Sequence, residues 1–190
     1  ASMENLAHCG IKTICYNFMP VIDWTRTDLK FKLSTGAYAL RFDQQKFAAF
    51  DLFILQRVNA ELDYSEQELA EAKQVFEQMT VVERKQLTNN IIAGLPGKMT
   101  AAYGIDDFRA MLACYKDITP EILRNNLCRF LAQVLPRAEA LGVKLAIHPD
   151  DPPRDMLGLP RVICTADDLE LLFDALPSPS NGITLCVGTY

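Results

Sequence analysis

The order of elements between residues 119 and 187 is the strongest constraint on the fold. Thr119, followed by a proline and an acid, is typical of a helix start, and the helix predicted from there ends at Gly142. A short apolar run at 143–147 predicts a buried strand, and after a second helix the run at 183–187 predicts another. Helix, strand, helix and strand in this order are typical of βα units on a parallel sheet.

Further signals refine these elements. The second helix is predicted to begin at Thr165, where Asp168 can complete a cap, and to end near Leu176. Pro136 lies inside the long helix and lacks a backbone donor, so we expect a kink there, or a break and restart. The apolar, β-branched run at 11–20 predicts a third buried strand, which precedes the others in the chain.

The segment 29–97 is predicted to be a β-hairpin and helical insertion. Apolar and polar residues alternate over 29–42 about a Ser-Thr-Gly turn, which is typical of a hairpin. Apolar residues at helical spacing predict a helix at 44–58. A capping-box pattern that starts at Ser65 predicts more helix, up to a glycine and proline break at 94–97.

The whole chain, 1–190, is predicted to be a single domain of the α/β class and an incomplete one. Parallel strands need cover on both faces, and a barrel needs closure, so three parallel strands are too few for either arrangement. The chain is therefore interpreted as a slice of a larger fold.

Composition excludes several function classes. The formal net charge is -5 and no basic cluster stands out, which argues against binding to nucleic acid. No apolar run is long enough for a membrane span and no secretory leader is recognisable, so we expect no membrane partner and a cytoplasmic location. The six cysteines show no CxxC pairs and are interpreted as reduced thiols, and all but Cys186 are expected to be small core side chains.

Two potential metal ligands lie at the ends of predicted strands, His148 directly after 143–147 and Cys186 near the end of 183–187. In parallel α/β folds the ligand site forms at the carboxyl ends of the strands, and this places His148 and Cys186 at one rim. An imidazole and a thiolate can share a metal ion, although a lone histidine is more often structural. Asp150 and Asp151 could orient the ring or could be solvated loop acids, and His8, before the first strand, is interpreted as structural.

The loop after the first predicted strand carries groups that suit a polyhydroxy acid. Arg26 could bind a carboxylate with its forked guanidinium, and Asn17 and Asp23 could bond to hydroxyls. The alternative is a surface loop with an ordinary Asp-Arg ion pair, and the residues alone leave both interpretations open.

Five strings of the chain resemble the bacterial mannonate dehydratase family. The resemblance extends over nearly all of the 190 residues, and YNFMPVIDWTRT and HPDDPPR are long and unusual, which makes it specific. The strings are NLAHCGIKTICYNFMPVIDWTRTDL (5–29), ALRFDQQKFAAFD (39–51), LTNNIIAGLPG (87–97), AIHPDDPPRDMLGLPR (146–161) and NGITLCVGTY (181–190).

The resemblance implies a partial (β/α)8 TIM barrel of the xylose-isomerase-like type, with the three strands as the fourth to sixth of the barrel. It implies dehydration of D-mannonate to 2-keto-3-deoxy-D-gluconate in hexuronate breakdown, with a divalent metal, Mn2+ first and Fe2+ as the alternative. His148 and Cys186 match two of the four metal ligands of the family, whereas the other two ligands and the acid-base groups are expected beyond Tyr190. Arg154 joins the loop residues above as an expected substrate contact.

The resemblance also sets expectations for the chain by itself. Its partner is expected to be a small sugar acid, and the protein to be a homo-oligomer. The isolated chain should be inactive, because half a ligand set binds metal weakly. Two alternatives stay open: a non-catalytic truncated module that self-associates or binds a partner through exposed strand edges, and a sugar isomerase with the same metal geometry.

Overall fold

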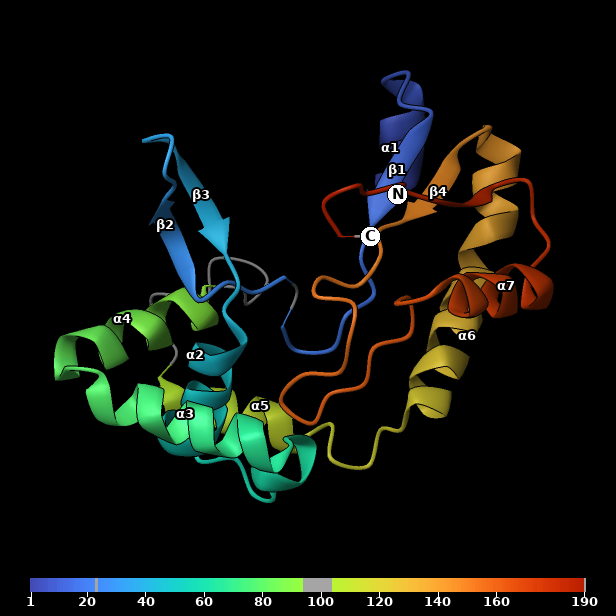
Figure 1. The fold of residues 1–190 in the computed structure, drawn as a ribbon. Coiled ribbons are helices and arrows are strands. Elements are labelled where there is room, and N and C mark those ends of the chain that lie inside the picture. The colour runs from blue at the N-terminus through green and yellow to red at the C-terminus, as the bar shows by residue number, and fades with distance from the viewer. Residues whose placement is uncertain (23, 94–103, 190) are drawn as a thin grey trace. The chain divides into compact units, whose positions relative to one another are not determined.

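The computed structural model describes residues 1–22, 24–93 and 104–189, which form two compact units of mixed α/β structure (Figure 1). Each unit is described by itself. Unit 1 comprises Ala1–Pro20, Asp117–Met156 and Pro160–Tyr190, and unit 2 comprises Val21–Lys116 and Leu157–Leu159. The prediction of a single domain over 1–190 with an insertion at 29–97 stays a prediction.

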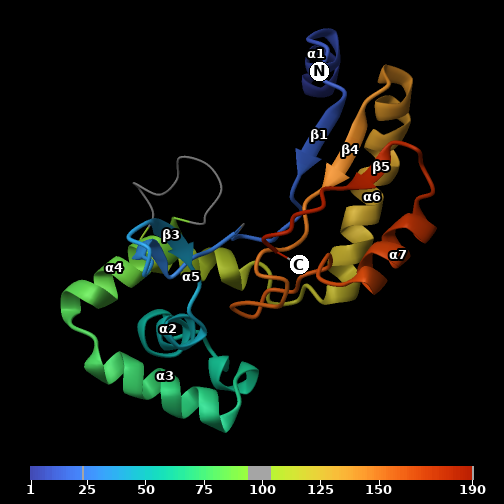
Figure 2. The same ribbon diagram turned by 45° about the horizontal axis from the view of Figure 1, so that its top comes forward.

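Unit 1 is built on a parallel sheet, as the sequence predicts. Among the described residues its strands are β1 (Thr13–Tyr16), β4 (Lys144–Ile147) and β5 (Asn181–Ile183), in the order β1-β4-β5 (Figure 2). Tyr16 is level with Ile147, and Ile147 with Ile183, so all three strands end at the same edge.

The predicted bounds of the last strand, 183–187, are wrong. The strand is Asn181–Ile183, and pairing ends where the Thr184 backbone N–H donates to the Ile147 carbonyl at 2.8 Å. Because β4 itself stops at Ile147, the residues that follow Thr184 have no strand beside them. Cys186 therefore lies in the loop after the strand.

Helices α6 (Pro120–Leu141) and α7 (Ala166–Ala175) pack against this sheet, and α1 (Ser2–His8) contacts α6. Figure 2 shows α6 running alongside β4. Leucines repeat every four residues along α6 and point into one core, since that spacing keeps them on one helix face. The core of unit 1 comprises Leu123, Leu127, Leu131, Leu135, Ala138, Leu145, Ile147, Val162, Ile163 and Leu172.

Helix α6 passes through Pro136 as one helix, so the predicted break and restart is wrong. Leu135 and Ala138, on either side of the proline, are both buried in the core, and this packing holds the turn that lacks a backbone donor. The helix ends at Gly142, as predicted, in the left-handed conformation with φ 64°.

Unit 2 begins with the predicted hairpin. Strands β2 (Asp28–Lys32) and β3 (Tyr38–Arg41) pair antiparallel, with an irregular register between Asp28 and Phe31. Side chains on the solvent side, such as Tyr38 at 67% exposure, leave the hairpin largely open to water.

Helices make up most of the rest of unit 2. They are α2 (Gln44–Ala49), the π-helix η1 (Phe50–Leu55), the 3-10 helix η2 (Ala60–Asp63), α3 (Glu66–Gln78), α4 (Val81–Ile92) and α5 (Ile105–Ala113).

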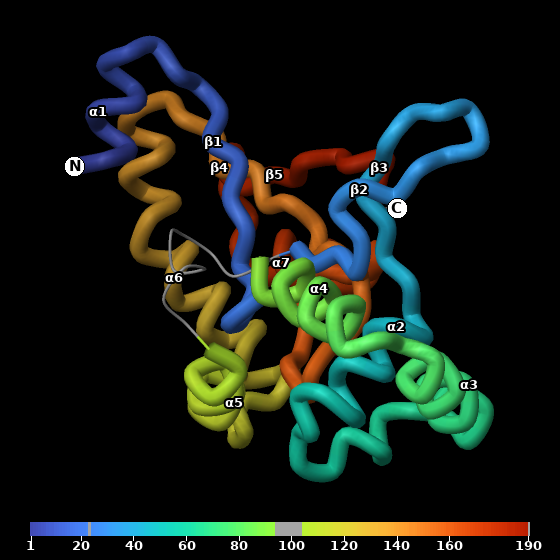
Figure 3. The backbone as a smooth tube through the Cα atoms, turned by 90° about the vertical axis from the view of Figure 1, so that its left-hand side faces the viewer, coloured from blue at the N-terminus to red at the C-terminus, as the bar shows by residue number. Residues whose placement is uncertain are grey.

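One prediction for these helices needs correction. The helix predicted at 44–58 is α-helical only to Ala49 and continues as a π-helix to Leu55. The helical segment predicted from Ser65 to the 94–97 break consists of α3 and α4, and Thr80 forms a second capping box that starts α4 (Figure 3). The break at 94–97 lies outside the described residues. None of the helices in the described part of the chain combines the length and apolar character needed to cross a membrane.

Candidate metal and substrate site

His148 directly follows β4 and is anchored through both its backbone and its ring. Its backbone N–H donates to the Tyr16 carbonyl at 2.8 Å, which ties it to the end of β1. Ring atom Nδ1 lies 2.7 Å from the Pro149 carbonyl oxygen. A carbonyl oxygen can only accept, so Nδ1 carries the proton and Nε2 of the neutral ring keeps its lone pair. When the ring is neutral, this tautomer gives Nε2 a lone pair that could bind a cation.

Cys186 lies in the loop after β5, as a free and partly exposed thiol. The Thr189 hydroxyl donates to the sulfur at 3.3 Å. This bond, together with the Gly188 backbone N–H and the His148 side chain, lowers the pKa of the Cys186 thiol. The structure therefore brings the two residues singled out by the sequence together within unit 1, and it makes the Cys186 thiol more acidic than an ordinary cysteine.

A thiolate beside a neutral imidazole can serve as two ligands of a divalent metal, since both donors carry lone pairs in the form a metal needs. Among the residues that the structure describes, no group of three or more His, Cys, Asp or Glu side chains could hold a metal ion. The donor set fits a metal and amounts to part of a full coordination shell.

Asp150 is buried and bonds to the backbone of a neighbouring loop, without a described bond to the His148 ring. It is 2% exposed, so it is not a solvated loop acid, and burial raises its pKa. Its Oδ2 accepts the backbone N–H groups of Val162 and Ile163 at 2.9 and 2.7 Å, whereas the His148 ring is bonded to the Pro149 backbone carbonyl. The carboxylate thus binds the loop before α7.

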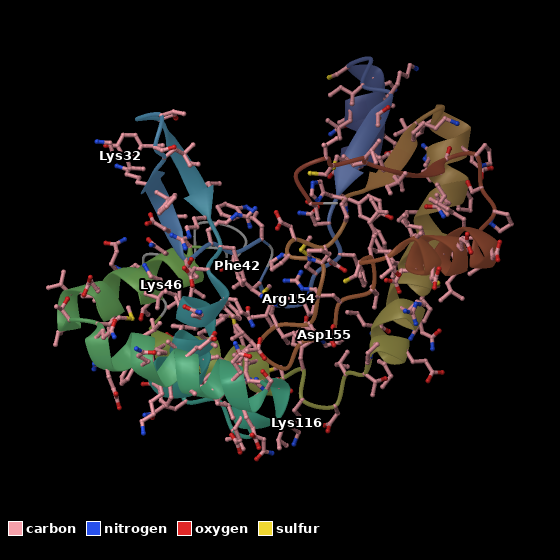
Figure 4. The ribbon with its side chains drawn as sticks, in the orientation of Figure 1. Lys32, Phe42, Lys46, Lys116, Arg154 and Asp155 are labelled. Atoms are coloured by element: carbon pink, nitrogen blue, oxygen red, sulfur yellow. The ribbon has the colours of Figure 1, made fainter. Side chains whose placement is uncertain are left out.

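The predicted substrate contacts are divided between the units. Asn17 is exposed immediately after β1 in unit 1. Arg154 is exposed in the loop after β4, beside Asp155 (Figure 4). In unit 2 the Arg26 guanidinium donates to the Thr25 carbonyl at 2.7 Å and lies 5.5 Å from the centroid of the Trp24 ring. Asp23 lies outside the described residues.

Two partners of the site were missed from the sequence. The Thr189 hydroxyl had a local signal, because it follows the cysteine by three positions, the spacing of a turn. The Pro149 carbonyl had none, because every residue carries a carbonyl and only the path of the loop decides which one meets the ring.

Comparison with known proteins places the chain in a family. The D-mannonate dehydratase (UxuA) family model matches residues 1–190. Three curated proteins named mannonate dehydratase match over 189 residues: 55% identical in Marinomonas sp. (strain MWYL1), 52% in Chromohalobacter salexigens and 51% in Saccharophagus degradans. Each match covers 100% of this chain but only 47–48% of the relative, so the chain spans about half the length of these proteins.

A solved structure agrees with these matches. The crystal structure of mannonate dehydratase from Streptococcus suis serotype 2 is 33% identical, with a TM-score of 0.64. The likeness covers 100% of this chain and 40% of that one. By sequence over its entire length, and by the similarity of its fold, the chain belongs to the D-mannonate dehydratase (UxuA) family.

Proposed function

We propose that this chain is part of a mannonate dehydratase that converts D-mannonate to 2-keto-3-deoxy-D-gluconate and water. The observation that supports this most directly is the contact between His148 and Cys186 at the carboxyl ends of neighbouring parallel strands. Family membership over residues 1–190 supports the substrate, a sugar acid.

The proposed architecture is a partial (β/α)8 barrel, in which β1, β4 and β5 are the fourth to sixth strands. The parallel order of the strands and the similarity to the Streptococcus suis enzyme support it. In such barrels the reacting groups lie at the carboxyl ends of the strands, the edge that carries His148 and Cys186.

His148 and Cys186 would hold a divalent cation, Mn2+ or alternatively Fe2+, with further ligands from outside this chain. When bound, the cation supplies Lewis-acid chemistry, which stabilises negative charge beside the carboxylate of the substrate. The residues of this chain prepare the site: the Pro149 carbonyl holds the His148 ring in one tautomer, and the Thr189 hydroxyl stabilises the sulfur anion.

Asn17, Asp23, Arg26 and Arg154 are the proposed substrate contacts. An arginine can pair with the carboxylate through two parallel bonds, and the amide and the carboxylate side chains can bond to hydroxyls. The reaction removes the proton on C2 and expels the C3 hydroxyl as water, after which the enol relaxes to the ketone. We assign the general acid and base to parts of the enzyme outside this chain.

The test compares histidine and cysteine variants in the longer enzyme that contains this sequence. His148→Ala and Cys186→Ala should each lower the rate of keto-deoxy-gluconate formation at least about 100-fold. His8→Ala and Cys9→Ala are matched controls, since both residues are exposed near the end of α1, and they should keep the rate. Full activity in the His148 and Cys186 variants, or a ketose isomer as the product, would contradict the proposal.

The 190-residue chain by itself is proposed to be inactive and to self-associate. Strands β1 and β5 are the edges of the described sheet in unit 1, and unpaired strand edges associate readily. Turnover by the isolated chain comparable to that of the longer enzyme, or a monomeric mass in size-exclusion chromatography with light scattering, would count against this part.

A further inference from the structure

Asp150 forms a buried hub two residues after His148. Its carboxylate accepts the backbone N–H groups of Val162 and Ile163, and the Cys164 thiol lies 3.7 Å from the same oxygen. Its other oxygen lies 3.6 Å from the Arg161 guanidinium. This one side chain thus holds four consecutive residues of the loop that precedes α7.

The backbone of Asp150 belongs to the same arrangement. Its N–H donates to the Ile163 carbonyl at 2.9 Å. The Ile163 N–H in turn donates to the Asp150 carboxylate. Asp150 and Ile163 are therefore joined by two hydrogen bonds of opposite direction, and both residues are buried.

This arrangement reaches His148 through one peptide group. The Asp150 N–H and the Pro149 carbonyl belong to the same planar peptide unit, and in a trans peptide they point in opposite directions. The N–H side is bonded to Ile163, and the carbonyl side accepts Nδ1 of His148 at 2.7 Å. Rotation of this peptide plane would break both bonds together.

We propose that Asp150 is a positioning residue for His148: by accepting the N–H groups of Val162 and Ile163, its carboxylate fixes the peptide plane whose carbonyl holds the ring with Nδ1 protonated, so that Nε2 could serve as a metal ligand. This inference rests on the proposed function only where it assigns a metal to Nε2. The tautomer lock is a property of the chain itself.

On this proposal the position of the acceptor oxygen, and not its charge, fixes the peptide plane. Asp150→Asn keeps an oxygen in the place that accepts the two N–H groups and loses the charge. Asp150→Glu keeps the charge and displaces the oxygens by one methylene. Asp155→Asn is the matched control, because Asp155 accepts the Arg161 backbone N–H at 2.8 Å in the same loop without contacting the Asp150 peptide in any described bond.

Long-range 1H–15N spectra of the metal-free 190-residue chain at about pH 8 report the tautomer of each ring. The chain contains only two histidines, so His8 serves as an internal reference. The wild type, Asp150→Asn and Asp155→Asn should show the single tautomer protonated at Nδ1 for His148, whereas Asp150→Glu should show a mixture. A locked ring in Asp150→Glu, a mixture in Asp150→Asn, or a mixture in Asp155→Asn would each overturn the proposal.

A titration of the same samples with Mn2+ separates this inference from the proposed function. Outer contacts of metal-bound histidines typically affect affinity 10- to 100-fold, so broadening of the His148 signals should need about 10-fold more Mn2+ or greater in Asp150→Glu. If Mn2+ broadens His148 in none of the proteins while the tautomer pattern holds, the metal assignment fails and the positioning role stands. Equal broadening in Asp150→Glu and wild type, with His148 affected in both, would overturn the link from Asp150 to the metal.

Discussion

The buried carboxylate of Asp51 offers the sharpest test of what holds unit 2 together. Asp51 is 0% exposed and accepts three bonds from Arg57, at 3.0, 3.3 and 2.8 Å, and one from the Tyr64 hydroxyl at 3.0 Å. The same guanidinium also reaches Asp63 at 2.6 Å, but the Asp63 side chain is 50% exposed. Two carboxylates thus share one arginine, one of them in the core and the other in water.

Asp51→Ala should destabilise unit 2 by about 3–5 kcal/mol, because it leaves a mostly buried guanidinium with only the exposed Asp63 and removes the acceptor of the Tyr64 hydroxyl. Asp63→Ala should cost less than about 1 kcal/mol, since a solvated ion pair contributes little. Urea unfolding followed by the fluorescence of Trp24, the single tryptophan, reports on this unit. With a slope of about 2 kcal/mol/M, the midpoint should fall by about 1.5–2.5 M for Asp51→Ala.

Tyr64→Phe completes the design, because it removes one donor and leaves the packing nearly unchanged. It should cost about 1.5 kcal/mol in the wild type and almost nothing in the Asp51→Ala background, where the acceptor is already gone. Equal losses for Asp51→Ala and Asp63→Ala would refute the reasoning that burial, and not the ion pair as such, decides the contribution.

Three further predictions concern unit 1. Burial raises the pKa of Cys164 to about 12, whereas that of Cys186 is lowered, so iodoacetamide at about pH 7.5 should modify Cys186 at least about 10-fold faster. Similar rates of modification in peptide mass spectra would contradict this. Partial burial opposes ionisation of Asp168, but bonds from the Cys164 N–H and other donors lower its pKa on balance. The contribution of ionised Asp168 to the free energy of unfolding is present above about pH 4 and is lost as the pH falls through the lowered pKa. In urea unfolding, the stability of Asp168→Asn should therefore fall less on acidification than that of the wild type. An unchanged pH dependence of the unfolding free energy would contradict this. Gly142→Ala should lower the unfolding free energy by about 1–2 kcal/mol, because φ is 64° there while no atom obstructs a Cβ; Gly182→Ala, without a positive φ, should cost less in the same thermal melts.

Local chemistry made much of the fold predictable. The cap at Thr165 with Asp168, the end of α6 at Gly142 and the hairpin each depend on a few neighbouring residues, and the structure confirms them. The capping box at Thr80 has the same kind of signal, with Glu83 three positions later, and was overlooked inside an otherwise continuous helical pattern.

Other features depend on contacts that no window of sequence contains. The last strand stops at Ile183 because its neighbour β4 stops at Ile147, more than thirty residues earlier. Three of the six cysteines, Cys9, Cys15 and Cys114, are exposed although they were expected in the core, since apolar neighbours along the chain do not decide which face of an element meets solvent.

The candidate site combines both kinds of information. That His148 and Cys186 meet could be predicted, because parallel strands that lie side by side end at the same edge, and each residue follows such a strand. What orients them could not: the ring is held by the Pro149 carbonyl, and the carboxylate next to it turns away to bind Val162 and Ile163. Residue types therefore indicate which atoms could bind a metal, whereas the return path of a loop from residues 161–164 determines the tautomer in which the ring is presented.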